Sequence, residues 1–221
     1  MREYKVSVVI PTYNTWKLTQ GLVDCLSRHE SENIDEIVVV NDASTISGGV
    51  ESDLQVWIDH LTENSGFPIA CNTGLKKVCK DIAEKRAVFL ISNDVVVNGK
   101  FIEQAADILF GAKRTLIGNR HIFWDSGWNK FDGKVFDYLE GWFFAATSDA
   151  WRDLNYFDEA YSPYDYEDVD LATTAKAKGY KLVSLNNPNI KHMGAQTIGF
   201  NPAREAITRR NQEYFRKKWL P

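Results

Sequence analysis

Two short runs of β-branched residues near the N-terminus each end at polar residues, which is typical of buried strands in a parallel sheet. The first run covers residues 5–10 and is closed by Pro11, and the second covers residues 36–40 and leads into residues 41–44. Between them, leucines recur at helical spacing, at Leu18, Leu22 and Leu26. Because parallel strands need a crossover connection, this strand-helix-strand order predicts a parallel sheet.

The same alternation continues to residue 91. Residues 54–61 have a helical pattern with Leu54, Trp57, Ile58 and Leu61, residues 68–78 predict another helix, and residues 87–91 predict a central strand. That strand ends at the tripeptide Ser92-Asn93-Asp94. In open α/β sheets ligands bind beyond the carboxyl ends of the strands, so we expect the three polar strand ends to form one site.

The second half of the chain has a different pattern. Residues 118–136 are rich in aromatic residues and glycine and predict a hairpin or loop excursion. A strand is expected over residues 141–147, followed by a helix to residue 154 that is capped at Ser148 or Asp149. We expect Asp165 to cap a helix over residues 167–178, which Gly179 ends in a left-handed conformation. A strand over residues 180–185 then precedes His192, and residues 203–219 predict an amphipathic closing helix.

Composition narrows the class of protein. With 221 residues, 44% hydrophobic and 25% charged, the chain can bury one sizeable core, so we expect a single domain over residues 1–221, either whole or part of a larger protein. The net charge of −4 and the scattered basic residues argue against nucleic acid as a partner. No apolar run is long enough to span a bilayer, so we expect a soluble, cytoplasmic protein. The cysteines fit reduced packing residues, at Cys25, Cys71 and Cys79.

Single residues do not identify the chemistry. Asp94 after a strand is explained by turn formation, and His192 by a structural hydrogen bond. Four carboxylates crowd the start of the helix expected at residue 167, where the helix dipole alone stabilises negative charge, at Asp165, Glu167, Asp168 and Asp170. The functional interpretation therefore depends on the combination of these residues.

Five segments in order resemble the family-two glycosyltransferases. They are SVVIPTYN at residues 7–14, VVVNDAS at 38–44, ENSGF at 63–67, SNDV at 92–95 and YEDVDL at 166–171. Shorter pieces at residues 155–159, 178–180 and 190–192 keep the order, and the sequence looks closest to the rhamnosyltransferase-like branch. The resemblance covers nearly the whole chain.

The resemblance implies an α/β fold of the GT-A type, with a Rossmann-like, mostly parallel central sheet flanked by helices. Residues 1–95 would form the nucleotide-binding half. Residues 96–221 would form the acceptor and catalytic half, with a smaller sheet and loop region. The implied reaction is inverting, metal-assisted transfer of rhamnose or another hexose. The donor would be a UDP- or dTDP-linked sugar, and the acceptor a hydroxyl of a glycan.

By similarity to the family, nine residues bind the donor: Pro11, Thr12, Tyr13, Asn41, Asp42, Asn64, Gly66, Asn93 and Asp94. Asp94, the only aspartate kept from the DxD motif of the family, would hold Mn²⁺ or Mg²⁺ together with His192. The acidic net charge and the lack of a Walker-type loop fit a need for such an ion beside the diphosphate. Asp168 would be the general base, with Glu167 as its neighbour in the motif.

Two assignments have open alternatives. Trp124, Trp128 and Trp142 could stack on an acceptor sugar, but aromatic residues in loops also pack local cores. An inactive nucleotide-sugar or carbohydrate-binding module would keep the same strand ends and aromatic residues. A sugar nucleotidyltransferase fits less well, because no glycine-rich basic loop follows Ile10.

Overall fold

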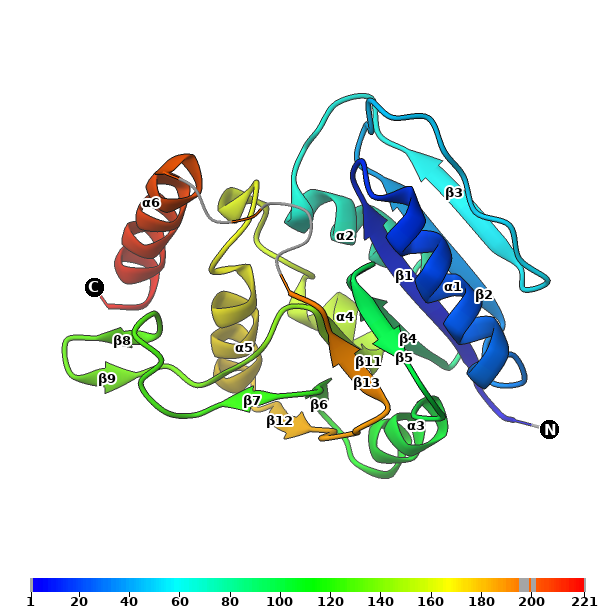
Figure 1. The fold of residues 1–221 in the computed structure, drawn as a ribbon. Helices are drawn as coiled ribbons and strands as arrows, with labels where there is room; N and C mark the ends of the chain where they lie inside the picture. The colour runs from blue at the N-terminus through cyan, green and yellow to red at the C-terminus, as the bar shows by residue number, and fades with distance from the viewer. Residues whose placement is uncertain (1, 195–198, 200–201, 221) are drawn as a thin grey trace.

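A seven-stranded sheet forms the centre of the molecule. The computed structural model describes residues 2–194, 199 and 202–220 (Figure 1). The strand order is β12-β6-β11-β4-β1-β2-β3, and only β11 runs antiparallel to its neighbours. The predicted α/β fold with a mostly parallel sheet is therefore confirmed. The strands are β1 Lys5–Thr12, β2 Glu36–Asn41, β3 Val56–His60, β4 Arg86–Ile91, β6 Thr115–Gly118, β11 Phe143–Thr147 and β12 Lys181–Ser184.

Helices cover both faces of this sheet, and three short strand pairs form separate two-stranded sheets outside it (Figure 1). The helices are α1 Trp16–Glu30, α2 Phe67–Val78, α3 Ile102–Gly111, α4 Ser148–Leu154, α5 Glu167–Ala177 and α6 Pro202–Trp219, with a 3-10 turn at Glu159–Tyr161. The paired short strands are β5 Val95–Val97 with β13 Ile190–His192, β7 His121–Ile122 with β10 Tyr138–Leu139, and β8 Lys130–Phe131 with β9 Lys134–Val135.

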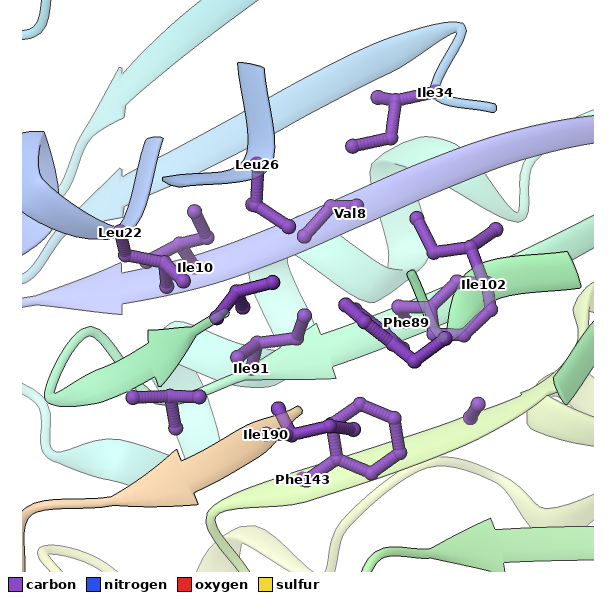
Figure 2. Packing of buried hydrophobic residues seen from close by; sticks show 14 of the residues in the cluster. Val8, Ile10, Leu22, Leu26, Ile34, Phe89, Ile91, Ile102, Phe143 and Ile190 are labelled. Carbon is purple, nitrogen blue, oxygen red and sulfur yellow. The ribbon is translucent and has the colours of Figure 1, made fainter. Parts of the chain in front are cut away.

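The period-two alternation of the strands divides the core between the two faces. Val8 and Ile10 of β1 pack under α1 and α3, whereas Val9 between them packs under α2 and α4. Figure 2 shows Leu22 and Leu26 of α1 pointing toward Ile10 and Val8 of β1. Both faces of β1 are buried, which explains why residues 6–11 are apolar except for Ser7. This rigid centre fixes the strand ends at which the site is built.

The prediction of a helix over residues 54–61 is wrong, because Val56–His60 forms strand β3 at the edge of the sheet, parallel to β2. Leu54, Trp57 and Ile58 satisfy helical spacing by coincidence. In the structure, Trp57 faces solvent and Ile58 packs partly on the core. The segment has only five residues, and in so short a segment pairing with a neighbouring strand decides the conformation.

Both predicted caps also differ from the structure. Helix α4 is capped by the hydroxyl of Thr147, which accepts a hydrogen bond from the backbone N–H of Ala150, so Ser148 is already inside the helix. Helix α5 starts after Tyr166, which makes no side-chain cap, and the carboxylate of Asp165 binds Arg204 instead. The left-handed Gly179 after α5 is confirmed, with φ of 78°.

A third apolar cluster attaches α6 to the second half of the chain. Phe215 of α6 is fully buried, and its ring lies 5.1 Å from that of Phe136 and 5.3 Å from that of Phe131. The predicted excursion over residues 118–136 contains the β8–β9 hairpin that supplies part of this cluster (Figure 1). The predicted closing helix thus lies over the excursion. None of the helices in the described ranges is long and apolar enough to cross a membrane.

Candidate active site

A cleft of about 770 Å³ opens beyond the carboxyl ends of β1, β2 and β4, next to the start of α5. The three polar strand ends lie together in it, as the strand pattern predicts. Residues from both halves of the chain line the cleft. They include Pro11, Thr12, Tyr13, Asp42, Asn64, Gly66, Asn93, Asp94, Tyr138, Glu140, Gly141, Trp142, Tyr164, Asp165, Glu167, Asp168, His192 and Arg204.

Asp42, at the end of β2, fixes the loop that forms one wall of the cleft. Its carboxylate accepts hydrogen bonds from the backbone N–H groups of Ser65 (2.7 Å) and Gly66 (2.9 Å). Gly66 has φ of 90°, and a Cβ there would lie 2.4 Å from Cα of Pro163. Only glycine therefore fits this position. Burial raises the pKa of Asp42, and the two backbone donors counteract that shift.

Asn41 does not line the cleft, unlike Asp42 beside it. The side-chain nitrogen of Asn41 lies 2.9 Å from Nδ1 of His60, and its side-chain oxygen Oδ1 accepts a hydrogen bond from the backbone N–H of Ser44. These contacts join β2 to the edge strand β3 and to the loop after β2. Asp42 thus lines the cleft, and Asn41 is not among the residues that line it.

The amide of Asn93 points toward the first helix. Its nitrogen lies 2.6 Å from the hydroxyl of Thr15, 3.1 Å from that of Thr19 and 3.2 Å from that of Thr12. Asn93 is 5% exposed and Thr19 is fully buried. This cluster ties the end of β4 to the β1–α1 connection, so Asn93 also has a structural role.

Asp94 and His192 meet at the floor of the cleft. Nε2 of His192 lies 3.1 Å from Oδ1 of Asp94, and the antiparallel pair β5–β13 sets His192 opposite Val95. The imidazole stacks on the indole of Trp142, with ring centroids 5.2 Å apart and an interplanar angle of 11°. Nε1 of that indole donates to the carboxylate of Glu140 at 2.9 Å. The orientation of the imidazole is therefore set by contacts on two sides.

The Asp94–His192 pair fits part of a site for a divalent cation. One carboxylate oxygen and one imidazole nitrogen lie close enough to share an ion, and the side chain of Asp94 is only 8% exposed. Residues 2–194, 199 and 202–220 hold no group of three or more His, Cys, Asp or Glu side chains that would form a complete protein cage. An ion that takes its other ligands from phosphate and water suits such a two-residue site.

The two acidic residues at the start of α5 occupy different environments. Asp168 accepts hydrogen bonds from the backbone N–H groups of Val169 (2.8 Å) and Gly141 (3.1 Å). Burial nevertheless raises its pKa to about 7, and the nearby charge of Asp165 acts in the same direction. Glu167 is 7% exposed, and its Oε2 has no hydrogen-bond partner among the described residues. Burial and the charge of Asp168 raise the pKa of Glu167 as well. With a pKa of about 7, the carboxyl group of Asp168 is suited to general acid-base catalysis.

The structure adds a cation that the sequence motifs did not reveal. Arg204 of α6 lines the cleft, and its guanidinium makes a two-point ion pair with Asp165, at 2.7 and 3.1 Å. Thr208, one turn later, donates to the same carboxylate at 2.7 Å. No motif included Arg204, because its place depends on how α6 packs against a segment far away in the sequence.

Of the three tryptophans considered for acceptor contact, Trp124, Trp128 and Trp142, only Trp142 lines the cleft. Trp124 lies outside it and is 43% exposed, on the connection between β7 and β8. Tyr138, Glu140 and Tyr164 also line the cleft and were missed, because they lie outside the recognised segments.

A family model described as glycosyl transferase family 2 matches residues 7–170. The chain is 31% identical over 109 residues to TarS of Staphylococcus aureus, a poly(ribitol-phosphate) beta-N-acetylglucosaminyltransferase. That match covers 46% of this chain and 18% of TarS. The glycosyltransferase GlyG of Streptococcus pneumoniae is 27% identical over 143 residues, which are 62% of this chain and 44% of GlyG. The chain therefore spans less than half the length of these relatives.

Solved structures share the fold at low sequence identity. GalNAc-T7 with UDP, GalNAc and Mn²⁺ has a TM-score of 0.72 at 13% identity, over 98% of this chain and 48% of that one. TarS 1–349 in complex with UDP-GlcNAc has a TM-score of 0.61 at 19% identity, over 95% of this chain and 66% of that one. These similarities show the GT-A fold that the sequence segments predict.

Proposed function

The chain belongs to glycosyltransferase family 2, and from this we propose that it transfers a sugar from a nucleotide diphosphate to a hydroxyl of a glycan, with inversion at the anomeric carbon. The observation that supports this proposal most is that one cleft contains both Asp168 and the Asp94–His192 pair. A proton acceptor and a site for a diphosphate-bound cation are the two components that such a transfer needs.

The donor would bind against the part of the cleft formed by residues 1–95. Pro11 and Thr12 end β1 and Tyr13 follows it, while Asp42 and the loop at Asn64 and Gly66 form the wall beyond β2. Asn93 and Asp94 complete this side after β4. The structures of TarS with UDP and with UDP-GlcNAc support a UDP-linked sugar, and a mannosyltransferase of related fold was solved with GDP-Man. The relatives described above are not named as rhamnosyltransferases, so rhamnose stays a prediction.

Positive charge at the diphosphate would come from two sources. Asp94 and His192 would hold Mn²⁺ or Mg²⁺, which supplies Lewis-acid stabilisation of the leaving diphosphate when bound. Related folds solved with Mn²⁺ support such an ion. Arg204 lines the same cleft and is restrained by Asp165, so its guanidinium would add a fixed cation.

Asp168 would take the proton from the acceptor hydroxyl as that hydroxyl attacks the anomeric carbon. Its two backbone donors fix the carboxylate in place, and its raised pKa gives it enough basicity to accept a proton near neutral pH. Glu167 would lie beside the reacting sugar as a buried neighbour whose pKa is raised by burial and by the charge of Asp168. We place the acceptor on the side formed by residues 96–221, with Trp142 inside the cleft and Trp124 outside it.

A thermal-shift screen of nucleotides and nucleotide sugars, each with and without Mn²⁺, tests the proposal. Ligand that binds only the folded protein raises its stability, by about 2.7 kcal/mol at a hundredfold excess over Kd. We expect UDP and one UDP-sugar to raise Tm, and Mn²⁺ to increase that rise. Matched concentrations of ATP serve as the control. A protein that responds to no nucleotide diphosphate or nucleotide sugar would contradict the proposal.

A further inference from the structure

Three large aromatic side chains lie exposed within six residues of the sequence, on the loop between β7 and β8. Phe123 is 70% exposed, Trp124 43% and Trp128 55%. Exposed apolar residues are ordinary when scattered, but a concentration of them indicates an interaction surface. We call residues 123–129 the aromatic loop.

The aromatic loop is built around a buried asparagine that fixes its shape. Asn129 is fully buried, and its oxygen accepts the backbone N–H and the hydroxyl of Ser126, both at 3.0 Å. Its nitrogen donates to the carbonyls of Trp124 and Phe136, both at 3.0 Å. Because one side chain satisfies four partners, the loop presents its aromatic rings from a defined backbone, which reduces the entropy lost on binding.

The aromatic loop is also continuous with the cleft. The guanidinium of Arg120 lies 5.7 Å from the ring of Trp124 and 3.3 Å from the carboxylate of Glu140, which lines the cleft. At the other end of the loop, the carbonyl of Trp128 accepts the hydroxyl of Tyr166 at 2.6 Å. Tyr166 directly precedes Glu167 at the cleft. A chain that enters the cleft from this side would pass over the aromatic rings.

Residues 119–140, which carry the aromatic loop, have no excess of positive charge of their own. Residues 119–140 contain three Lys or Arg and four Asp or Glu, which gives 3 − 4 = −1. The cations are engaged within the protein: Arg120 pairs with Glu140, Lys130 pairs with Asp125 at 3.0 Å, and the ammonium of Lys134 lies 4.5 Å from the ring of Phe136. Residues 119–140 by themselves therefore offer a phosphate-bearing polymer or an anionic membrane no excess positive charge. The C–H faces of neutral sugar rings, in contrast, stack well on aromatic rings.

We propose that the aromatic loop is an outer acceptor site that binds a neutral oligosaccharide, with Trp124 and Trp128 under successive sugar rings and the reacting end in the cleft. The inference rests on the proposed sugar transfer. It commits to an uncharged glycan, in contrast to the polyol phosphate named for TarS.

The test uses the full chain with UDP and Mn²⁺ and follows the indole N–H signals of its tryptophans by NMR. The probes are cellohexaose, chitohexaose and maltohexaose as neutral glycans, poly(ribitol phosphate) as an anionic polymer, and phosphatidylglycerol vesicles as an anionic surface. Trp57, on the distant edge strand β3, gives a matched control. Its side chain is 46% exposed, and its ring lies 5.8 Å from the ammonium of Lys77, as the ring of Trp124 lies near the guanidinium of Arg120. UDP affinity is measured on the same samples.

We expect at least one neutral hexasaccharide to shift the signals of Trp124 and Trp128 but not that of Trp57. W124A should raise the Kd of that hexasaccharide by roughly tenfold, which corresponds to about 1.4 kcal/mol, and W57A should leave this Kd unchanged. Failure of every neutral hexasaccharide to shift these signals would overturn the inference, as would larger shifts with the polymer or the vesicles, or an equal effect of W57A. If the aromatic loop alone is misassigned, UDP still binds; if UDP does not bind, the proposed function itself fails.

Discussion

Nε2 of His192 lies 3.1 Å from Oδ1 of Asp94, in a contact that β5–β13 pairing creates between distant parts of the chain. Under our proposal this pair holds the cation beside the diphosphate. Asp94→Ala should therefore abolish the Mn²⁺-dependent part of UDP affinity and leave the protein folded. Calorimetric titration of UDP with and without Mn²⁺ measures this. Asp149→Ala removes an 83% exposed carboxylate from α4 and serves as the control. Equal Mn²⁺ enhancement in Asp94→Ala and wild type would remove Asp94 from the metal site.

His192→Ala should weaken donor binding more than acceptor binding, because the imidazole touches Asp94 on the donor side of the cleft. The KM values for donor and acceptor, measured separately, provide the readout. His29 in the last turn of α1 is not among the residues that line the cleft, so His29→Ala is a suitable control. A change confined to the acceptor KM would move His192 to the other side of the cleft.

Gly66→Ala should lower both Tm and UDP affinity. The new Cβ would lie 2.4 Å from Cα of Pro163, at a backbone φ of 90° that L-residues rarely adopt. Gly133→Ala separates the steric clash from the backbone strain. Gly133 has φ of 80°, but nothing lies within 4 Å of a Cβ at that position. Strain alone costs about 1–2 kcal/mol, so Gly66→Ala should be clearly the more destabilising of the two. Similar losses in both variants would show that contact with Pro163 is unimportant.

The pH dependence follows from the raised pKa of Asp168, which is about 7 because the carboxyl group is buried. The base must be ionised, so the transfer rate should rise with pH through neutrality and level off above about pH 8. Stability should move in the opposite direction. The protonated carboxyl favours the folded state fully below its unfolded pKa of about 3.9, and this contribution is lost as pH rises through the folded pKa.

Asp168→Asn isolates this effect, because the amide does not titrate. The difference in Tm between variant and wild type should shift in favour of the variant as pH is raised from about 4 to about 8. Thermal melts of both proteins across this range provide the measurement. A Tm difference that is constant with pH would show that the pKa of Asp168 is not raised by folding.

Local pattern was enough to predict the centre of the sheet. The apolar runs at residues 5–10 and 87–91 became β1 and β4, because both faces of these strands are buried and the alternation with helices leaves few other arrangements. The edge strand β3 was mistaken for a helix, since Val56–His60 is short and its conformation depends on pairing with β2.

The residues of the site also differ in whether the sequence alone could identify them. Asp94, Asp168 and His192 were found because they lie in segments that resemble a known family, and the structure brings all of them to one cleft. Arg204 was missed, because its contact with Asp165 exists only once α6 has packed on the second half of the chain. Asn41 and Asp42 were both predicted from the family's second strand end; the amide of Asn41 faces His60, and Asp42 lines the cleft.

The most direct test of the account is the transfer rate of Asp168→Asn at about pH 8, measured at saturating donor together with UDP affinity. Asn retains one acceptor for the backbone N–H groups of Gly141 and Val169, and loss of the other should cost about 1–3 kcal/mol of stability. If Asp168 is the base, transfer by the folded variant falls by roughly 10²-fold or more while UDP still binds. A folded Asp168→Asn protein that binds UDP and transfers sugar at nearly the wild-type rate would contradict the proposed mechanism.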